Sequence, residues 1–110
     1  MKVLSSDIIR GHIDTIVLSV LLKGELYGVE IRKAINDKTN GLYQVSEQTL
    51  YSSFHRLEDG GFIKGFWGDE MRGSTRKYYR ITPRGVELYS VSVKEWENSK
   101  KLIDILISQN

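Results

Sequence analysis

The chain has 110 residues, no cysteine and a net charge of +2 at pH 7. This length suits one domain with its own core, and the lack of cysteine excludes disulfides and thiolate metal sites. The most apolar run, residues 13–22, is about half as long as a helix that spans a bilayer and contains Asp14. Because residues 1–11 also lack an export signal, we expect a cytoplasmic protein that does not enter a membrane.

A first helix is predicted from Ser5 or Ser6, either of which can cap it, to about Lys23, where Gly24 ends it. Its apolar residues form two lines. The first line is expected to face the core: Ile9, Ile13, Ile16, Val17, Val20 and Leu21. The second line lies on a neighbouring face: Ile8, His12, Thr15, Leu18 and Leu22. Apolar residues on two faces indicate two partners, and one of them could be a second chain.

A second amphipathic helix is predicted from about Leu26 to Lys38, followed by a turn at Asn40-Gly41. A third helix begins after Ser46, whose hydroxyl can cap the first turn. Its core face is defined by helical spacing: Leu50, Phe54 and Leu57. The opposite face carries hydrogen-bonding side chains: Gln48, Ser52 and His55. This third helix is therefore a candidate to present donors and acceptors to a ligand.

A β-hairpin is predicted directly after it, with strands near residues 62–67 and 77–81 and a turn at residues 72–74. Basic residues gather in this part of the chain, and no acidic residue lies between Met71 and Val86. They are Arg72, Arg76, Lys77, Arg80 and Arg84. Three short helices followed by a basic hairpin are typical of a winged helix-turn-helix, which places a helix in the major groove of DNA and a wing on the phosphates.

The last predicted helix starts at Thr82, a possible cap, with Pro83 in its first turn, and continues for about 25 residues. Its apolar seam steps alternately by three and four residues and is interrupted by Lys100. The predicted dimer-interface residues on this seam are Val86, Tyr89, Val93, Trp96, Ile103 and Ile107. Because little core remains for so long a helix to cover, it predicts a homodimer.

Several stretches of the chain resemble the PadR-like transcriptional regulators. They are RGHIDTIVLSVLLKGELYGVEI, SEQTLYSSFHRLEDGGFIKGFWGDE and GSTRKYYRITPRG, which together cover most of residues 8–85. The single C-terminal helix is similar to the shorter branch of that family. In a multidrug-binding repressor of this branch, a tryptophan at the place of Trp96 faces its symmetry mate and holds flat aromatic drugs in a pore between the protomers.

The resemblance implies an effector site at the dimer interface, lined by Ile8, Thr15, Leu18, Ser92, Val93, Trp96, Ser99 and Lys100. His12 and Lys100 depart from the family in charge or shape, which could make the pore narrower, more cationic or closed. The wing tip also differs, since it has Ser74 and Thr75 between Gly73 and Arg76 where the family has glycine-glycine-arginine. Packing in an apolar seam is an equally good reading of Trp96.

The DNA-binding candidates have three predicted roles. Gln48, Ser52 and His55 are placed to meet base edges, where glutamine can pair with adenine. Phosphate contacts are expected from Thr49, Tyr51 and Arg56. The cap residue Ser46 is a further DNA-binding candidate. The wing would add affinity that does not depend on sequence through Arg72, Arg76 and Lys77.

No metal, cofactor or enzymatic activity is predicted. His12 and His55 lack the second histidine or carboxylate that a metal site needs. No nucleophile–base pair, phosphate loop or pair of carboxylates occurs at useful spacing.

We therefore expect a mainly α protein with a small β-hairpin. Residues 1–81 would form a winged helix-turn-helix DNA-binding domain, and residues 82–110 a C-terminal dimerisation helix packed with the first helix of the partner chain. The predicted function is a homodimeric repressor that binds a pseudo-palindromic operator and is released by a planar aromatic or hydrophobic small molecule at the dimer interface. Two alternatives stay open: a winged-helix module that binds protein, and a DNA-binding dimer without an effector.

Overall fold

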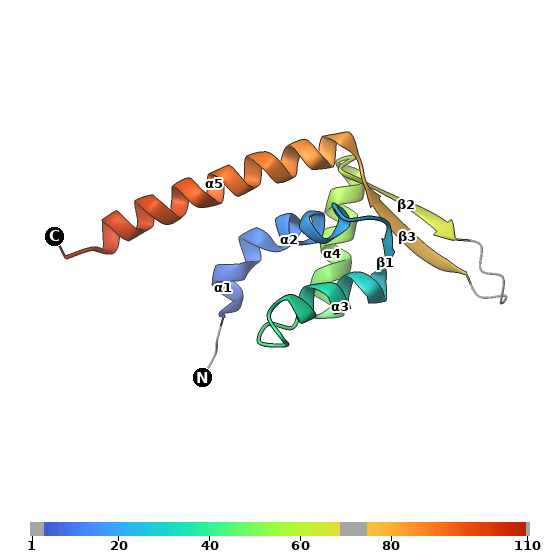
Figure 1. Ribbon diagram of the computed structural model, residues 1–110, viewed down its shortest axis with the longest axis horizontal. Helices are drawn as coiled ribbons and strands as arrows, with labels where there is room; N and C mark the ends of the chain where they lie inside the picture. The colour runs from blue at the N-terminus through green and yellow to red at the C-terminus, as the bar shows by residue number, and fades with distance from the viewer. Residues whose placement is uncertain (1–3, 69–74, 110) are drawn as a thin grey trace.

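The structure is a computed structural model, and it describes residues 4–68 and 75–109. Its elements follow the expected order of helices, hairpin and long helix, so the predicted fold class is confirmed (Figure 1). The bounds are α1 Ser6–Ile9, η1 Arg10–His12, α2 Ile13–Leu21, β1 Leu26–Tyr27, α3 Gly28–Lys38, α4 Glu47–Asp59, β2 Ile63–Gly68, β3 Arg76–Ile81 and α5 Pro83–Ile107. The molecule measures 62 × 33 × 21 Å because α5 extends past the small domain.

The N-terminal helix is broken, and the prediction of one continuous helix to Lys23 was wrong. Ser5 caps α1 as expected, with its Oγ accepting from the Ile8 N–H at 3.3 Å. A 3-10 turn, η1, then separates α1 from α2. Gly11 lies in this turn and costs about 1 kcal/mol relative to alanine inside a helix. His12 follows with φ −116° and ψ −4°, and the chain changes direction there before α2 begins.

The second helix begins two residues later than predicted. Leu26 and Tyr27 are extended and form β1, which pairs antiparallel with Tyr79 and Tyr78 of β3. The Tyr27 N–H donates to Glu30 Oε1 at 3.1 Å, which closes the first turn of α3. Pairing with a strand some fifty residues away competes with helix formation here, and local periodicity contains no sign of that partner.

The wing is part of a three-stranded sheet in the order β1-β3-β2, one strand more than the predicted hairpin. One face of the sheet covers the core with Ile63 and Tyr79. On the other face the Phe66 and Tyr78 rings stack at 5.8 Å, and the Tyr27 ring meets Tyr78 edge-on at 5.5 Å. Aromatic contacts on both faces make the base of the wing a well-packed platform.

The core lies between α2, α3, α4 and the sheet. Its buried apolar residues are Ile13, Val17, Leu18, Val20, Leu21, Ile31, Ile35, Val45, Leu50, Phe54, Leu57, Ile63 and Tyr79. Ile9 and Ile16 pack partly buried against them. Leu18, which was placed on the second stripe of the first helix, is fully buried in this core. The helix direction changes at η1, so the faces of a straight helix drawn from Ser6 do not apply to α2.

Thr82 and Gly85 fix where α5 starts. Thr82 Oγ1 accepts from the Gly85 N–H at 3.1 Å, so the predicted cap is confirmed. Gly85 is buried, and an added Cβ would lie 2.1 Å from the Phe62 carbonyl oxygen. Only glycine allows α5 to leave the sheet at this close distance from the loop before β2.

Candidate nucleic-acid interface

Helix α4 has the two faces that its sequence predicts. Leu50, Phe54 and Leu57 are buried, whereas Gln48, Ser52 and His55 are exposed. Ser46 Oγ accepts from the Thr49 N–H at 3.1 Å and also lies 2.9 Å from Thr49 Oγ1, which confirms the cap. The exposed side therefore offers an amide, a hydroxyl and an imidazole, held on a helix whose other side is anchored in the core.

Arg56 lies on one flank of α4 and is held by Asp14 of α2. The Asp14 carboxylate accepts from Arg56 Nη2 at 2.8 Å and from Nε at 3.2 Å, and from the buried Ser53 hydroxyl at 2.6 Å. The hydrogen bond to Asp14 raises the pKa of the Arg56 guanidinium. Arg56 thus has a structural partner that fixes the direction of its guanidinium.

Tyr51 lies on the opposite flank of α4. Its ring meets Phe54 edge-on with centroids 5.5 Å apart, and an added Cβ on Gly28 would lie 3.2 Å from the Tyr51 hydroxyl oxygen. This flank therefore packs tightly against the start of α3. Tyr51 remains half-exposed and able to meet a ligand.

The wing is tied to α4 through Glu58. This carboxylate accepts from the Gly65 N–H at 3.2 Å and from Lys77 Nζ at 3.3 Å. Arg76 lies over the Tyr27 ring at 4.7 Å, and Arg80 Nη1 lies 3.9 Å from Glu25 Oε2. Of the predicted wing cations, Arg76 and Lys77 are in place on β3, and Arg72 lies outside the described residues.

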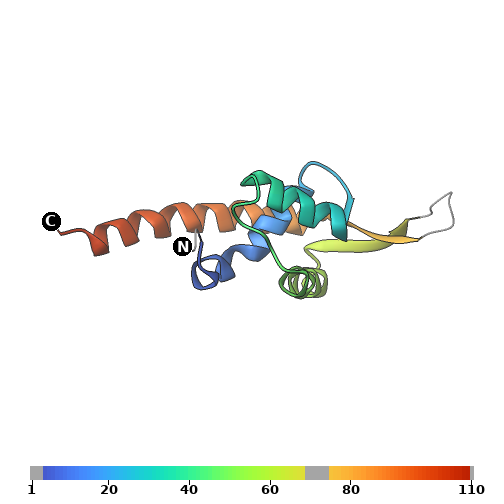
Figure 2. The same cartoon turned by 90° about the horizontal axis from the view of Figure 1, so that it is seen from below.

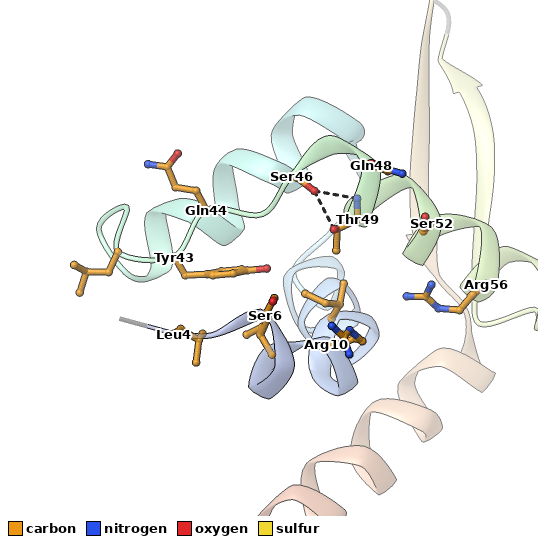
Figure 3. A pocket seen from close by; sticks show the side chains of 13 residues that line it. Leu4, Ser6, Arg10, Tyr43, Gln44, Ser46, Gln48, Thr49, Ser52 and Arg56 are labelled. Carbon is orange, nitrogen blue, oxygen red and sulfur yellow. Dashed lines mark hydrogen bonds between the residues drawn. The ribbon is translucent and has the colours of Figure 1, made fainter. Parts of the chain in front are cut away.

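The N-terminal helices, the segment just before α4 and one side of α4 line a cleft of about 760 Å³ (Figure 3). The polar part of its lining comes from Ser6, Arg10, Gln44, Ser46, Gln48, Thr49, Ser52 and Arg56. The apolar part comes from Leu4, Ile9, Ile13, Leu42 and Tyr43. Five of the predicted DNA-binding residues thus share one cleft with residues of α1 and η1 that were not predicted.

A second, smaller cavity of about 320 Å³ lies between the N-terminal helices and α5. Its lining residues are Leu4, Ile8, Ile9, His12, Thr15, Ile16, Ser92, Val93 and Trp96. The His12 ring meets Trp96 edge-on at 4.6 Å, and Lys100 Nζ lies 5.9 Å from the centre of the Trp96 ring.

Five of the predicted effector residues line this cavity, namely Ile8, Thr15, Ser92, Val93 and Trp96. Leu18 does not line it because it is buried in the core. Ser99 and Lys100 lie further along α5, and neither belongs to the lining.

Sequence reasoning missed the carboxylates that organise the site. Asp14 and Glu58 hold Arg56 and Lys77, and Asp14 also satisfies the buried Ser53. One signal for Asp14 was available, since a carboxylate inside the most apolar run needs a partner when the run is buried. No comparable signal existed for Glu58, whose partners depend on how the hairpin folds back. Among the described residues, no group of three histidine or acidic side chains is arranged to hold a metal.

A helix-turn-helix with an exposed polar recognition helix and a basic wing defines a winged-helix DNA-binding protein. No helix among the described residues is long and apolar enough to cross a bilayer. Residues 17–90 match the family described as Transcriptional regulator PadR-like family. The chain belongs to this family of transcriptional regulators, whose members bind DNA.

Two solved structures of regulators similar to the chain agree with this assignment. A transcriptional regulator from Clostridium thermocellum is 50% identical, with a TM-score of 0.88 over 96% of this chain and 100% of that one. A PadR family regulator from Clostridium difficile is 30% identical, with a TM-score of 0.73 over 89% and 100% of the two chains. An uncharacterized protein of Lysinibacillus sphaericus is 46% identical over 102 residues, 93% of this chain and 94% of that protein.

Proposed function

We propose that the protein is a homodimeric repressor that binds a pseudo-palindromic operator in the cytoplasm. The observation that carries the proposal is the second half of α5, where large apolar side chains are exposed along a helix that leaves its own domain (Figure 1). They are Trp96, Leu102, Ile103, Ile105, Leu106 and Ile107. Large apolar patches on a small protein mark an interface, and a second copy of α5 is a self-complementary partner.

This proposal assigns residues 82–110 to dimerisation and residues 1–81 to DNA binding. The residues of the predicted seam contribute unequally in one protomer, because Tyr89 and Val93 are half-buried against α2 whereas Ile103 and Ile107 are exposed. We infer that Ile103 and Ile107 meet the partner chain and that Val86, Tyr89, Val93 and Trp96 line the region where both chains approach α2.

A symmetric dimer presents two α4 helices to one face of DNA. Successive major-groove sites on that face are about 34–36 Å apart, so the operator would have two half-sites at that spacing. Gln48, Ser52 and His55 are our candidates for base contacts, and Arg76 and Lys77 for phosphate contacts on the wing. Bound over a promoter, such a dimer would compete with transcription initiation.

We further propose that a planar aromatic molecule in the Trp96 cavity releases the DNA. The support is the apolar cavity between α5 and the N-terminal helices, into which the exposed Trp96 indole opens. Asp14 of α2, one of these N-terminal helices, anchors α4 through Ser53. A ligand that moves the DNA-binding domains of the two protomers apart would change the spacing of the α4 helices and so weaken DNA binding.

Three measurements test the proposal: sedimentation, salt-dependent DNA binding and dye titration. Analytical ultracentrifugation should give a dimer for the wild type and a monomer for Ile103→Asp, with DNA affinity lost in parallel. Titration with a planar aromatic dye should quench tryptophan fluorescence in the wild type and in Trp67→Phe, and not in Trp96→Ala. Equal quenching in Trp96→Ala would refute the effector site and favour a dimer without an effector. A wild type without salt-dependent DNA binding would favour the protein-binding alternative.

A further inference from the structure

Helix α4 has a different neighbour on each side. In both views of the ribbon, the wing extends on one side of α4, and α1 with η1 lies on the other (Figures 1 and 2). An α-helix with its side chains is about 10–12 Å wide, and the major groove is about 12 Å wide. A recognition helix therefore fills the groove, and the elements beside it meet the two phosphate backbones. The wing lies on the side of one backbone, and α1 with η1 lies on the side of the other.

The cleft on the side of α1 has a lining suited to an anion. Arg10 of η1 and Arg56 of α4 stand on its two walls and are the only charged side chains of its lining (Figure 3). Arg56 uses Nε and Nη2 for Asp14, and its Nη1 has no hydrogen-bond partner among the described residues. Arg10 has a side chain that is 73% exposed, and within residues 4–68 and 75–109 it pairs only with Asp7, at 3.1 Å.

The rest of the lining suits a sugar–phosphate chain. Hydroxyl groups from Ser6, Thr49 and Ser52 can donate to phosphate oxygens, and Leu4, Ile9 and Tyr43 give apolar surface for deoxyribose. Gln48 and Ser52 form part of the wall and are exposed on α4. DNA that α4 reads with these two residues would bring one of its backbones to this cleft.

We propose that this cleft receives the DNA backbone on the side of α4 away from the wing, and that Arg10 contacts a phosphate there. Helix α1 and η1 then form a third DNA-binding element beside α4 and the wing. The inference rests on the proposed use of α4 as the helix that reads DNA. A free phosphorylated molecule in the cleft has the same chemistry, and the shared wall with Gln48 and Ser52 favours DNA.

The test compares full-length wild type with Arg10→Gln in DNA binding at several salt concentrations. The probe is a duplex selected from a random library with the wild-type protein. One lost phosphate contact lowers the log–log salt slope by about 0.9, and by about 1.8 for a dimer. Affinity should fall by about eightfold per contact at 0.1 M salt. Ethylation of the contacted phosphate should weaken the wild type and leave Arg10→Gln unchanged.

Lys23→Gln is the matched control, because loop 22–25 lies on the far side of the molecule from α1 and α4 (Figure 2). Its salt slope should equal that of the wild type. Asp7→Asn should raise affinity by freeing Arg10, and this gain should vanish in the double variant with Arg10→Gln. A gain that persists there would show general charge repulsion only and would overturn the assignment.

Three other outcomes would decide between the proposed DNA contact, the proposed function and a free ligand. Equal salt slopes for Arg10→Gln and the wild type would overturn the inference and leave DNA binding by α4 intact. No DNA binding by the wild type would instead refute the proposed function. Inorganic pyrophosphate that binds the wild type and not Arg10→Gln, together with equal salt slopes of the two proteins on DNA, would assign the cleft to a free phosphorylated ligand.

Discussion

Replacing Asp14 with alanine tests whether a single carboxylate fastens α4 to the domain. The change removes the acceptor of the Ser53 hydroxyl, which is 0% exposed and lies 2.6 Å away. An unsatisfied buried group of this kind costs about 1–3 kcal/mol. The lost ion pair with Arg56 adds no more than about 1 kcal/mol, because the Arg56 and Asp14 side chains are 54% and 35% exposed.

We therefore expect Asp14→Ala to lower the free energy of unfolding by about 1–4 kcal/mol. Urea unfolding at fixed protein concentration measures this, since the stability of a dimer depends on concentration. Asp37→Ala is the control, because Asp37 forms an exposed pair with Lys33 at 2.6 Å and its loss should cost less than about 0.5 kcal/mol.

Ser53→Ala separates the two contributions. In that background no hydroxyl is left unsatisfied, so Asp14→Ala should cost only the part that comes from Arg56. A loss below about 0.5 kcal/mol for Asp14→Ala in the wild-type background would refute the reasoning. It would mean that water replaces the carboxylate at Ser53 without cost.

Three further predictions concern the backbone, a cap and a titrating group. Gly85→Ala should destabilise the protein by several kcal/mol or prevent folding, because the new Cβ would lie 2.1 Å from the Phe62 carbonyl oxygen; circular dichroism during thermal unfolding measures this. Ser46→Ala should cost about 1 kcal/mol in urea unfolding, since the Thr49 N–H loses its acceptor. Burial raises the pKa of Tyr79 from 10.0 to about 12, with the Glu58 carboxylate as a second cause. The folded state thus favours the protonated phenol, so stability should be level below pH 10 and fall as pH rises towards 12, and Tyr79→Phe should lack this decline.

Local sequence determined most of the helices of this protein. Ser46 and Thr82 marked where α4 and α5 begin, because a side-chain oxygen caps the amides of its own first turn. The spacing of Leu50, Phe54 and Leu57 gave the buried face of α4, and with it the exposed face that carries Gln48 and Ser52. These features depend on contacts within about four residues, which periodicity and capping describe well.

Tertiary contacts decided the rest. Leu26 and Tyr27 became a strand because β3 pairs with them, and Leu18 moved into the core because the helix changes direction at η1. Asp14 meets Arg56 and Ser53 across 42 and 39 positions of the chain, so no local pattern could pair them. The sequence by itself therefore determined which helix presents a polar face to solvent opposite its buried face. Only the folded chain decided how that helix is held and that α1 lies beside it, because both depend on residues that meet across long loops.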